Sequence, residues 1–245
     1  IDHCNTHSSF KDKVYMSNLC QEITLPTTPL QHIDDKNGEI ALCILSAINL
    51  GLIKEKDELE ELCDLSVRAL DEIIDYQEYP VEAAKISTEA RRSLGIGYIG
   101  LAHFLAKNKV KYDDKEALVL VDEITEAFQY YLLKASNTLA QEKGKCDWFD
   151  KTKYADGILP IDTYKKDLDS IIKRKLSYDW NTLRQDIKHH GLRHSTLSAQ
   201  MPSESSSVVS NATNGVEPPR DYLSIKKSKK GTLKQIVPDY NRLKN

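Results

Sequence analysis

The chain has 245 residues, of which 40% are hydrophobic and 29% are charged. Its 34 Lys and Arg residues against 37 Asp and Glu residues give a formal net charge of −3, so the composition offers no general basic field for nucleic acid. Only 10 glycines and 8 prolines occur, which excludes collagen-like, low-complexity and disordered chains. No apolar run is long enough to span a membrane. The composition predicts a soluble globular protein.

The cysteines predict a reducing compartment. They are odd in number, widely spaced and without a CxxC pair: Cys4, Cys20, Cys43, Cys63 and Cys146. This pattern fits neither a zinc ribbon nor a disulfide scaffold. No charged segment followed by a short apolar run marks a secretory signal, so we expect a cytoplasmic protein. The first residue is Ile1 rather than Met, which leaves open that the chain is part of a longer protein.

The N-terminal third predicts an irregular region followed by two helices. The first 35 residues are polar, with one short extended run over residues 19–25. Residues 39–53 form a largely apolar stretch that is too long for a typical strand and predicts a buried helix. Apolar residues then recur at helical spacing from Leu59 to Ile74. Because residues 55–75 carry nine acidic and two basic side chains, we expect a solvated acidic face on this helix.

The middle of the chain predicts three more helices. The longest begins near Asp113, where Glu116 completes a capping-box pattern. Asp162 and Asp179 are the predicted N-caps of two shorter helices, and Gly191 is predicted to end the second. The apolar stripe of the longest helix consists of Val121, Ile124, Phe128, Tyr131, Leu132, Ala135 and Leu139.

The C-terminal fifth predicts strands. Residues 195–201 are typical of one strand, and residues 222–237 of a hairpin that turns at residues 229–231. We expect the hairpin lysines to protect a solvated edge rather than to bind nucleic acid, because few aromatic residues lie among them. No internal repeat or flexible linker interrupts the chain. The sequence therefore predicts one α/β domain over residues 1–245.

A glycine motif matches a dinucleotide-binding fingerprint only on paper. Gly95-x-Gly97-x-x-Gly100 has the required spacing, but the fingerprint must follow a buried strand. Residues 88–94 contain two adjacent arginines and are poor material for such a strand. We expect these glycines to allow tight packing around a loop-to-helix junction instead.

Two adjacent pairs also have simpler interpretations than chemistry. Tyr130-Tyr131 could suggest radical transfer, but Tyr131 falls on the apolar stripe, which favours core packing. His189-His190 stands at a predicted helix end, and adjacent helical residues point in different directions, so the pair cannot easily chelate one metal. We expect it to interact with the helix C-terminus.

Residues 17–23, Ser-Asn-Leu-Cys-Gln-Glu-Ile, could bring three reactive groups together. If the segment is extended, its period of two turns Asn18, Cys20 and Glu22 to one side. An amide, a thiol and a carboxylate would then share one face. The alternative is a short strand with a buried cysteine and two polar residues in solvent, since no Cys/His pair is present.

Residues 201–207, Met-Pro-Ser-Glu-Ser-Ser-Ser, form the second candidate site. Small hydroxyl residues at a strand-to-helix junction leave backbone N–H groups free to bind phosphate, and their hydroxyls add donors. Helix capping is the alternative, but it would use one serine rather than four. These residues therefore indicate a phosphate site.

In combination, these segments resemble the large, catalytic subunit of class I ribonucleoside-diphosphate reductases. Residues 14–25 resemble that family's finger loop, and residues 202–207 its substrate-phosphate loop. The similarity runs in order along the whole chain and is nearest to the aerobic bacterial and phage branch. It implies the later half of a ten-stranded α/β barrel. Further similar segments are residues 38–43, 92–97, 130–137, 157–166, 211–215 and 217–220.

The resemblance implies a role for each matching residue. Cys20 would become a thiyl radical that removes the 3′ hydrogen of the substrate, Glu22 would be the base on the 3′ hydroxyl, and Asn18 would orient the ribose. Cys43 would be one of two cysteines that supply electrons as the 2′ hydroxyl leaves as water. Ser205 stands where relatives have Thr, and it keeps the hydroxyl. The implied substrate-binding residues are Asn18, Leu19, Cys20, Gln21, Glu22, Ser203, Glu204, Ser205 and Ser206.

The resemblance also implies partners and excludes others. No metal site and no cofactor bound by this chain are expected; the radical would come from a dimetal-tyrosyl small subunit, and thioredoxin or glutaredoxin would restore the dithiol. The substrate would be a ribonucleoside diphosphate, with neither membrane nor nucleic acid as partner, in the cytoplasm of a bacterium or phage-infected cell. The partner of Cys43, the relay tyrosines, the dNTP/ATP effector region and the cysteine tail are expected outside this chain, so the isolated chain is expected to be inactive.

Two alternatives remain beside this interpretation. One is a non-catalytic reductase remnant that acts as an assembly or interaction module, against which the intact trio Asn18, Cys20 and Glu22 argues. The other is a fragment of the cobalamin-dependent class II reductases, which share the finger-loop chemistry. The segments around Tyr130 and over residues 157–166 favour class I.

Overall fold

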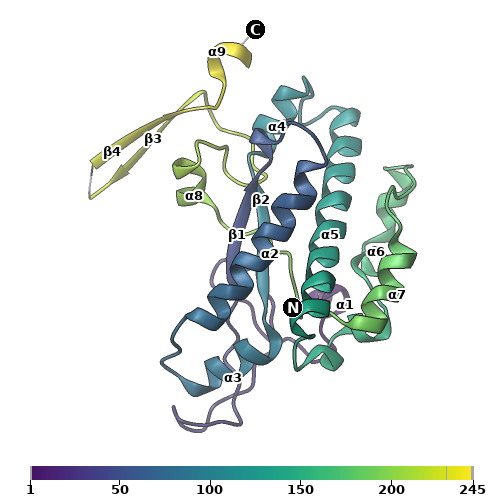
Figure 1. Cartoon of the computed structure of the whole chain (residues 1–245). Helices are drawn as coiled ribbons and strands as arrows, with labels where there is room; N and C mark the ends of the chain where they lie inside the picture. Colours follow the sequence, from purple (N-terminus) through teal and green to yellow (C-terminus); the bar gives the residue numbers. More distant parts are fainter. Residues whose placement is uncertain (1, 230, 244–245) are drawn as a thin grey trace.

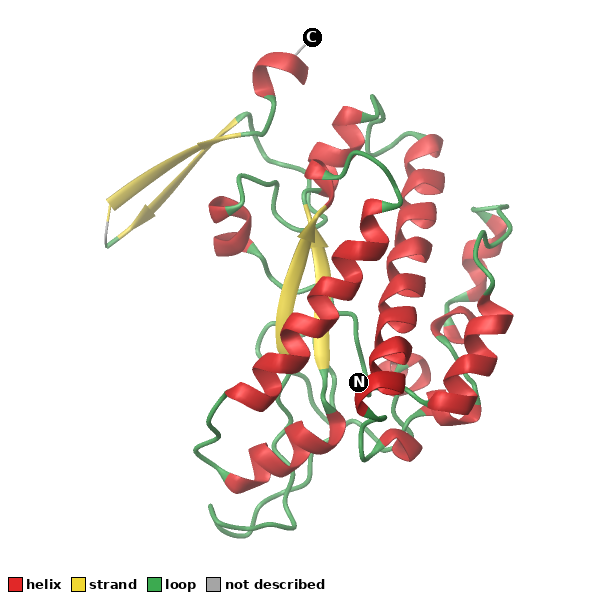
Figure 2. Ribbon diagram, viewed as in Figure 1, coloured by secondary structure: helices red, strands yellow, loops and turns green. Residues whose placement is uncertain are grey.

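The computed structural model describes residues 2–229 and 231–243 as an α/β assembly with its helices gathered around a short parallel sheet (Figures 1 and 2). The strands are β1 (Ile44–Asn49), β2 (Leu94–Ile99), β3 (Leu223–Ser228) and β4 (Gly231–Ile236). The helices are α1 (Asp2–His7), α2 (Glu58–Tyr76), α3 (Glu82–Arg91), α4 (Leu101–Lys107), α5 (Lys115–Lys143), α6 (Pro160–Thr163), α7 (Trp180–His190), α8 (Glu204–Val209) and α9 (Tyr240–Leu243). The predicted α/β class is confirmed.

The parallel sheet is built by a crossover connection. Strands β1 and β2 pair in parallel from Ile44 opposite Leu94 to Asn49 opposite Ile99, and α2 and α3 connect them. The 195–201 segment runs along the other edge of β2, where the Ile96 amide donates to the Leu197 carbonyl at 2.8 Å. The strand predicted there is present only as an isolated parallel bridge between Ser198 and Ile96.

The helix predicted over residues 39–53 is wrong. Its centre is strand β1, followed by a 3-10 turn over Leu50–Leu52. Parallel strands are buried on both faces and read as continuous apolar runs, which periodicity alone does not distinguish from a buried helix. The strand ends where the Asn49 side chain accepts a hydrogen bond from the Gly51 amide at 3.1 Å.

Helices α2 and α5 pack on each other and α2 also packs on the sheet (Figure 2). Both predicted stripes are confirmed: Leu59 and Ile74 of α2 are fully buried, and most stripe residues of α5 are buried. Most acidic side chains of α2 are exposed as expected, although Asp71 is buried and Glu60 binds Lys134 of α5 at 2.6 Å. Arg68 of α2 also binds Glu142 of α5 at 2.6 Å. The N-cap of α5 is Asp114 rather than Asp113, and it makes no capping box.

A buried polar cluster joins α2 to the segment that follows α7. The Asp71 carboxylate accepts hydrogen bonds from Arg92 at 2.6 Å and from His194 at 3.1 Å, and His194 also bonds Ser136 at 2.9 Å. Burial lowers the pKa of His194, so its neutral ring donates to Asp71 and accepts from the Ser136 hydroxyl. Burial opposes ionisation of Asp71, but the bonds from His194 and Arg92 outweigh it and hold its pKa well below the ordinary value.

The later elements confirm most of the predicted caps. Asp179 is the N-cap of α7 and accepts from the Thr182 amide at 3.0 Å, and Gly191 ends that helix. Asp162 is not an N-cap: it lies inside α6, where its carboxylate accepts from the Leu159 amide at 2.8 Å. The N-cap of α6 is Leu159, so the predicted cap is three residues late.

The predicted hairpin and both side-chain pairs are found where expected. Strands β3 and β4 pair antiparallel and extend away from the helices in Figure 1. Lys230, in the predicted turn, lies outside the described residues. Tyr131 is buried in the core and Tyr130 stacks on Tyr178, with ring centroids 4.7 Å apart. The two histidines, His189 and His190, close the last turn of α7.

Candidate active site

The 14–25 segment folds as a tight loop rather than a strand. The Asn18 carbonyl accepts from the Gln21 amide at 3.2 Å, and the Asn18 side chain accepts from the Ile23 amide at 3.1 Å. Gln21 has a φ of +65°, which no extended strand contains. The prediction that alternation places Asn18, Cys20 and Glu22 on one face is therefore wrong. The asparagine closes a turn of the backbone instead.

The tip of this loop is open to solvent. Leu19 is 96% exposed, and Asn18, Cys20 and Gln21 are also exposed. Cys20 is a free thiol, so the radical cysteine implied by the resemblance is accessible and not a packed core residue. The alternative of a short strand with a buried cysteine is thereby excluded.

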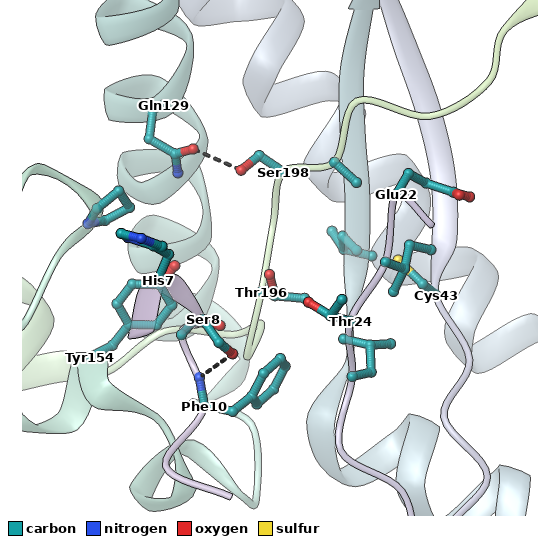
Figure 3. A pocket seen from close by; sticks show the side chains of 16 residues that line it. His7, Ser8, Phe10, Glu22, Thr24, Cys43, Gln129, Tyr154, Thr196 and Ser198 are labelled. Atoms are coloured by element: carbon teal, nitrogen blue, oxygen red, sulfur yellow. Dashed lines mark hydrogen bonds between the residues drawn. The ribbon is translucent and has the colours of Figure 1, made fainter. Parts of the chain in front are cut away.

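A cavity of about 420 Å³ lies at the base of the loop (Figure 3). Figure 3 shows Glu22 and Cys43 on one side of this cavity and Gln129 on the other, where it accepts a hydrogen bond from Ser198 at 2.7 Å. Polar and apolar groups both face the space, which suits an amphipathic ligand such as a nucleoside. Its walls come from residues 7–10 and 22–25, together with Cys43, Leu94, Gln129, Tyr154, Pro160, Thr196, Ser198 and Ala199.

Glu22 and Cys43 are two interacting ionisable groups that line the cavity. Burial, and secondly the negative charge of Glu22, raise the pKa of the Cys43 thiol to about 12. One oxygen of Glu22, Oε2, is buried and has no hydrogen-bond partner among the residues described. A buried carboxylate oxygen without a hydrogen-bond partner destabilises the folded chain. This atom is therefore suited to accept a hydrogen bond from a hydroxyl of a bound ligand.

The Gly95-x-Gly97 motif lies on β2 and leaves one face of this strand without side chains at these two positions. A Cβ at Gly95 would lie 3.0 Å from the Cys43 sulfur, and a Cβ at Gly97 would lie 2.4 Å from the Ala199 carbonyl oxygen. Gly95 and Gly97 lie within the strand rather than after it, so they do not form a dinucleotide fingerprint, and the predicted close packing is confirmed. Only Gly100 stands at the predicted loop-to-helix junction, with a φ of +78° before α4.

The same two glycines connect Cys43 to the serine-rich segment. Residues two apart in a strand face the same side and are separated by about 6–7 Å. A Cβ at Gly95 would meet Cys43, and a Cβ at Gly97 would meet Met201, which leads directly into residues 202–207. Cys43 and Met201 therefore lie over the same face of β2 at neighbouring positions.

The predicted helix junction at the serine-rich segment is confirmed. Ser203 is the buried N-cap of α8, and its hydroxyl donates to Asn214 at 2.9 Å, so it is used within the protein. Residues 204–206 are exposed in the first turn of α8. The Ser206 hydroxyl donates to the Ser203 carbonyl at 3.2 Å.

The structure brings together some of the predicted site residues and not others. Glu22 and Cys43 share the cavity, whereas Asn18, Cys20 and residues 203–206 do not line it. Sequence reasoning missed the contributions of Thr24, Gln129, Thr196 and Ser198. They come from three separate stretches of chain, and no local pattern marks them.

Two further cysteines, Cys63 and Cys146, do not line the cavity. Cys63 and Cys146 are buried, and burial raises the pKa of each thiol, that of Cys146 to about 12. Across residues 2–229 and 231–243, no group of three or more His, Cys, Asp and Glu side chains could hold a metal ion. No helix in this part of the chain is both long and apolar enough to cross a membrane.

Comparison with known proteins decides the family. Residues 1–245 match the family described as "Ribonucleotide reductase, barrel domain". The chain belongs to the ribonucleotide reductase barrel-domain family. It is 62% identical over 248 residues to the ribonucleoside-diphosphate reductase subunit alpha of Buchnera aphidicola from Schizaphis graminum, covering 100% of this chain and 32% of that subunit.

Other relatives place the barrel-domain chain among bacterial and phage reductases. The Escherichia coli K12 ribonucleoside-diphosphate reductase 1 subunit alpha is 62% identical over 246 residues, covering 99% of this chain and 32% of the relative. The subunit alpha of Enterobacteria phage T4 is 45% identical over 244 residues, with 98% and 32% covered. The chain thus spans about a third of the length of the relatives it matches. The family inferred from the sequence motifs is confirmed.

Proposed function

We propose that this barrel-domain chain acts, as part of a complete alpha subunit, in the reduction of ribonucleoside diphosphates to 2′-deoxyribonucleoside diphosphates for DNA precursor synthesis. The observation that carries the proposal is the meeting of Glu22 and Cys43 at one cavity. A reductase needs a base for the 3′ hydroxyl and a reducing thiol on the same substrate. In this proposal residues 14–25 are the finger loop and residues 202–207 the phosphate loop.

The residues act in sequence on the ribose. Cys20, as a thiyl radical, takes the 3′ hydrogen atom, and Glu22 accepts the 3′ hydroxyl proton while Asn18 orients the ring. The 2′ hydroxyl takes up a proton and leaves as water. Two electrons come from Cys43 and a second thiol of the complete subunit, which join as a disulfide. Cys20 then returns its hydrogen atom to the 3′ carbon, so the sum is one diphosphate reduced and one dithiol oxidised.

The high pKa of Cys43 suits this role. A thiol whose pKa is about 12 carries its proton at neutral pH and can therefore donate hydrogen to the ribose of the substrate. The open tip of the loop suits the role of Cys20, because a radical must reach it from outside this chain. The phosphate groups would be held by residues 203–206 at the start of α8, with the ribose over the sheet face beside Gly95.

The partners follow from the same proposal. The radical comes from a separate small subunit with a dimetal-tyrosyl centre, and thioredoxin or glutaredoxin reduces the disulfide. Effector nucleotides bind to other regions of the complete subunit. The setting is the cytoplasm of a bacterium or of a phage-infected cell, without membrane or nucleic acid as partner.

The test uses a composite subunit, in which these 245 residues replace the matching segment of the Escherichia coli relative. Cys20→Ser preserves size but replaces the S–H bond with a stronger O–H bond, so turnover of the nucleoside diphosphate should be lost while binding remains. Cys63→Ser, at a buried cysteine away from the cavity, is the control and should keep turnover. Deoxynucleotide formation by the Cys20→Ser composite subunit would overturn the proposal.

A further inference from the structure

Arg91, at the end of α3, is a buried arginine that binds two carboxylates. Its side chain is 3% exposed. Nη2 donates to Asp12 at 2.8 Å and to Glu39 at 3.2 Å, and Nε also donates to Glu39. The guanidinium carbon lies 4.8 Å from the centre of the Trp148 ring, within cation–π distance. Such a buried fork is held in one geometry by its partners.

The partners of Arg91 flank the 14–25 loop on both sides. Asp12 stands two residues before the loop and binds Arg91 directly. Thr28 stands three residues after it and is joined to Glu39 by two backbone hydrogen bonds, of 3.1 and 2.9 Å. Glu39, itself buried, carries this connection to Arg91. The two ends of the loop are thus tied to one guanidinium.

The contact between Arg91 and Glu39 also lies near the segment that contains Cys43. Cys43 follows Glu39 by four residues, just before β1 begins. Glu39 is therefore close to Cys43 in the chain, and it is also bonded to the outgoing side of the loop through Thr28. Glu22, on the loop, faces Cys43 across a distance short enough for its charge to raise the thiol pKa. The relative position of these two groups depends on the segments that Arg91 joins.

The neighbouring arginine provides a natural comparison. Arg92 is equally buried and also binds two carboxylates, Asp71 at 2.6 Å and Asp75 at 2.7 Å. Both of these lie on α2, so Arg92 joins two helices and touches neither end of the loop. Arg91 instead joins α3 to two irregular segments, neither of which has a helix or strand of its own to hold it.

We propose that Arg91 is a positioning residue that holds the base of the 14–25 loop and thereby sets Glu22 against Cys43. The assignment rests on the proposed function for its catalytic consequence, but its structural part does not. Loops without regular structure open locally at low cost unless specific bonds hold them. Catalytic groups displaced by about 1 Å lose rate by as much as 100-fold.

The first experiment measures hydrogen exchange in the composite subunit. The amides of Val14, Asn18, Gln21 and Ile23 are hydrogen-bonded and report opening of the loop. Asp12→Asn should speed their exchange by roughly 3- to 10-fold. Asp75→Asn removes a carboxylate of similar exposure from Arg92, with side chains 40% and 48% exposed, and should leave these amides unchanged. Equal exchange in the two variants would overturn the proposal.

The second experiment measures steady-state kinetics of the same subunit. Arg91→Lys keeps the charge but loses the fork, so kcat should fall by about 10- to 100-fold while KM changes less than about twofold. Arg92→Lys is the matched control and should lower kcat much less. Adding Asp12→Asn to Arg91→Lys should cost little more, because both act on one contact. A parallel rise in KM, or equal losses for Arg91→Lys and Arg92→Lys, would contradict positioning.

The two proposals fail in different ways. If Cys20→Ser keeps turnover while Asp12→Asn still opens the loop, the proposed function is wrong and the structural role of Arg91 stands. If Cys20→Ser is inactive but the Asp12 and Arg91 variants behave like their controls, the function stands and the positioning role is wrong.

Discussion

The Glu22 carboxylate and the Cys43 thiol line the same cavity, and the charge of Glu22 adds to burial in raising the pKa of Cys43 to about 12. The two residues are 21 positions apart and come from a loop and from the start of a strand. Their coupling has a consequence for proton chemistry. Because the negative charge of Glu22 disfavours the thiolate, removal of that charge makes the Cys43 thiol easier to ionise.

This coupling predicts the effect of Glu22→Gln on Cys43. Loss of the negative charge favours the thiolate, so the pKa of Cys43 should fall below that of the unchanged protein, yet stay above the ordinary value because burial is the larger cause. The measurement is the pH dependence of Cys43 alkylation in the reduced composite subunit, followed by mass spectrometry of its peptide. Glu22→Asp keeps the charge and serves as control. An unchanged or raised pKa in Glu22→Gln would show that the two groups do not interact.

A second prediction concerns residues 202–207, the proposed phosphate loop. Replacing both Ser205 and Ser206 by Ala should raise KM for the nucleoside diphosphate and leave kcat nearly constant, because phosphate contacts bind ground and transition states alike. Each lost hydrogen bond to a charged group costs about 1.5–3 kcal/mol. Ser210→Ala, at the other end of α8, removes a hydroxyl that bonds the Ser206 carbonyl at 2.8 Å and is the control. Unchanged KM in the double variant would exclude these hydroxyls from substrate binding.

The helices were predictable because their signals are local. The stripe from Leu59 to Ile74 and the cap at Asp179 each lie within one helix, and both are confirmed. Strand β1 was not predictable, because its sequence, Ile-Leu-Ser-Ala-Ile-Asn, lacks the alternation of apolar and polar residues that identifies strands. The conformation of the loop around Cys20 was not predictable either. Its shape depends on one side chain, Asn18, bonding the backbone five residues later, and alternation carries no trace of such a bond.

The site was predictable only in part. The motif resemblance named Glu22 and Cys43, and the cavity unites them. The adjacent arginines that argued against a strand over residues 88–94 were correctly interpreted, since α3 occupies most of that segment. Their burial was not foreseen. A buried arginine needs carboxylates supplied by distant segments, and those partners become visible only when the chain is folded.

A third prediction concerns Asp71 and acid. Its pKa is held below the ordinary value, so it contributes stability that is complete above the unfolded pKa of about 3.9 and is lost as the pH falls below it. Asp71→Asn should lower the melting temperature of the composite subunit at pH 7, at a cost of about 3 kcal/mol for an unpaired buried network. The difference should persist to about pH 5 and shrink towards pH 3. Asp75→Asn, half-exposed, should cost less. A difference independent of pH would contradict the role of the charge.

The last prediction separates the two ends of the glycine motif. A Cβ at Gly97 would lie 2.4 Å from the Ala199 carbonyl oxygen and 2.8 Å from the Met201 methyl carbon, so Gly97→Ala must push the backbone of residues 199–201 away from β2. Overpacking of this kind costs about 1–3 kcal/mol, and here the displaced segment leads into Ser203. KM for the nucleoside diphosphate should therefore rise, and amides of residues 201–207 should exchange faster.

Gly95→Ala provides the comparison, because its Cβ meets different atoms. The nearest are the end of the flexible Leu45 side chain at 2.5 Å and the Cys43 sulfur at 3.0 Å. Leu45 can move aside, so residues 201–207 should keep their exchange rates, and the displaced thiol of Cys43 should lower kcat more than it raises KM. Steady-state kinetics of the two composite subunits, with melting temperatures to confirm folding, decide the matter. Identical changes in KM and kcat for Gly95→Ala and Gly97→Ala would mean that the two glycines serve only the packing of the sheet. In that case Gly97 would have no specific effect on residues 202–207, and Gly95 would have none on Cys43.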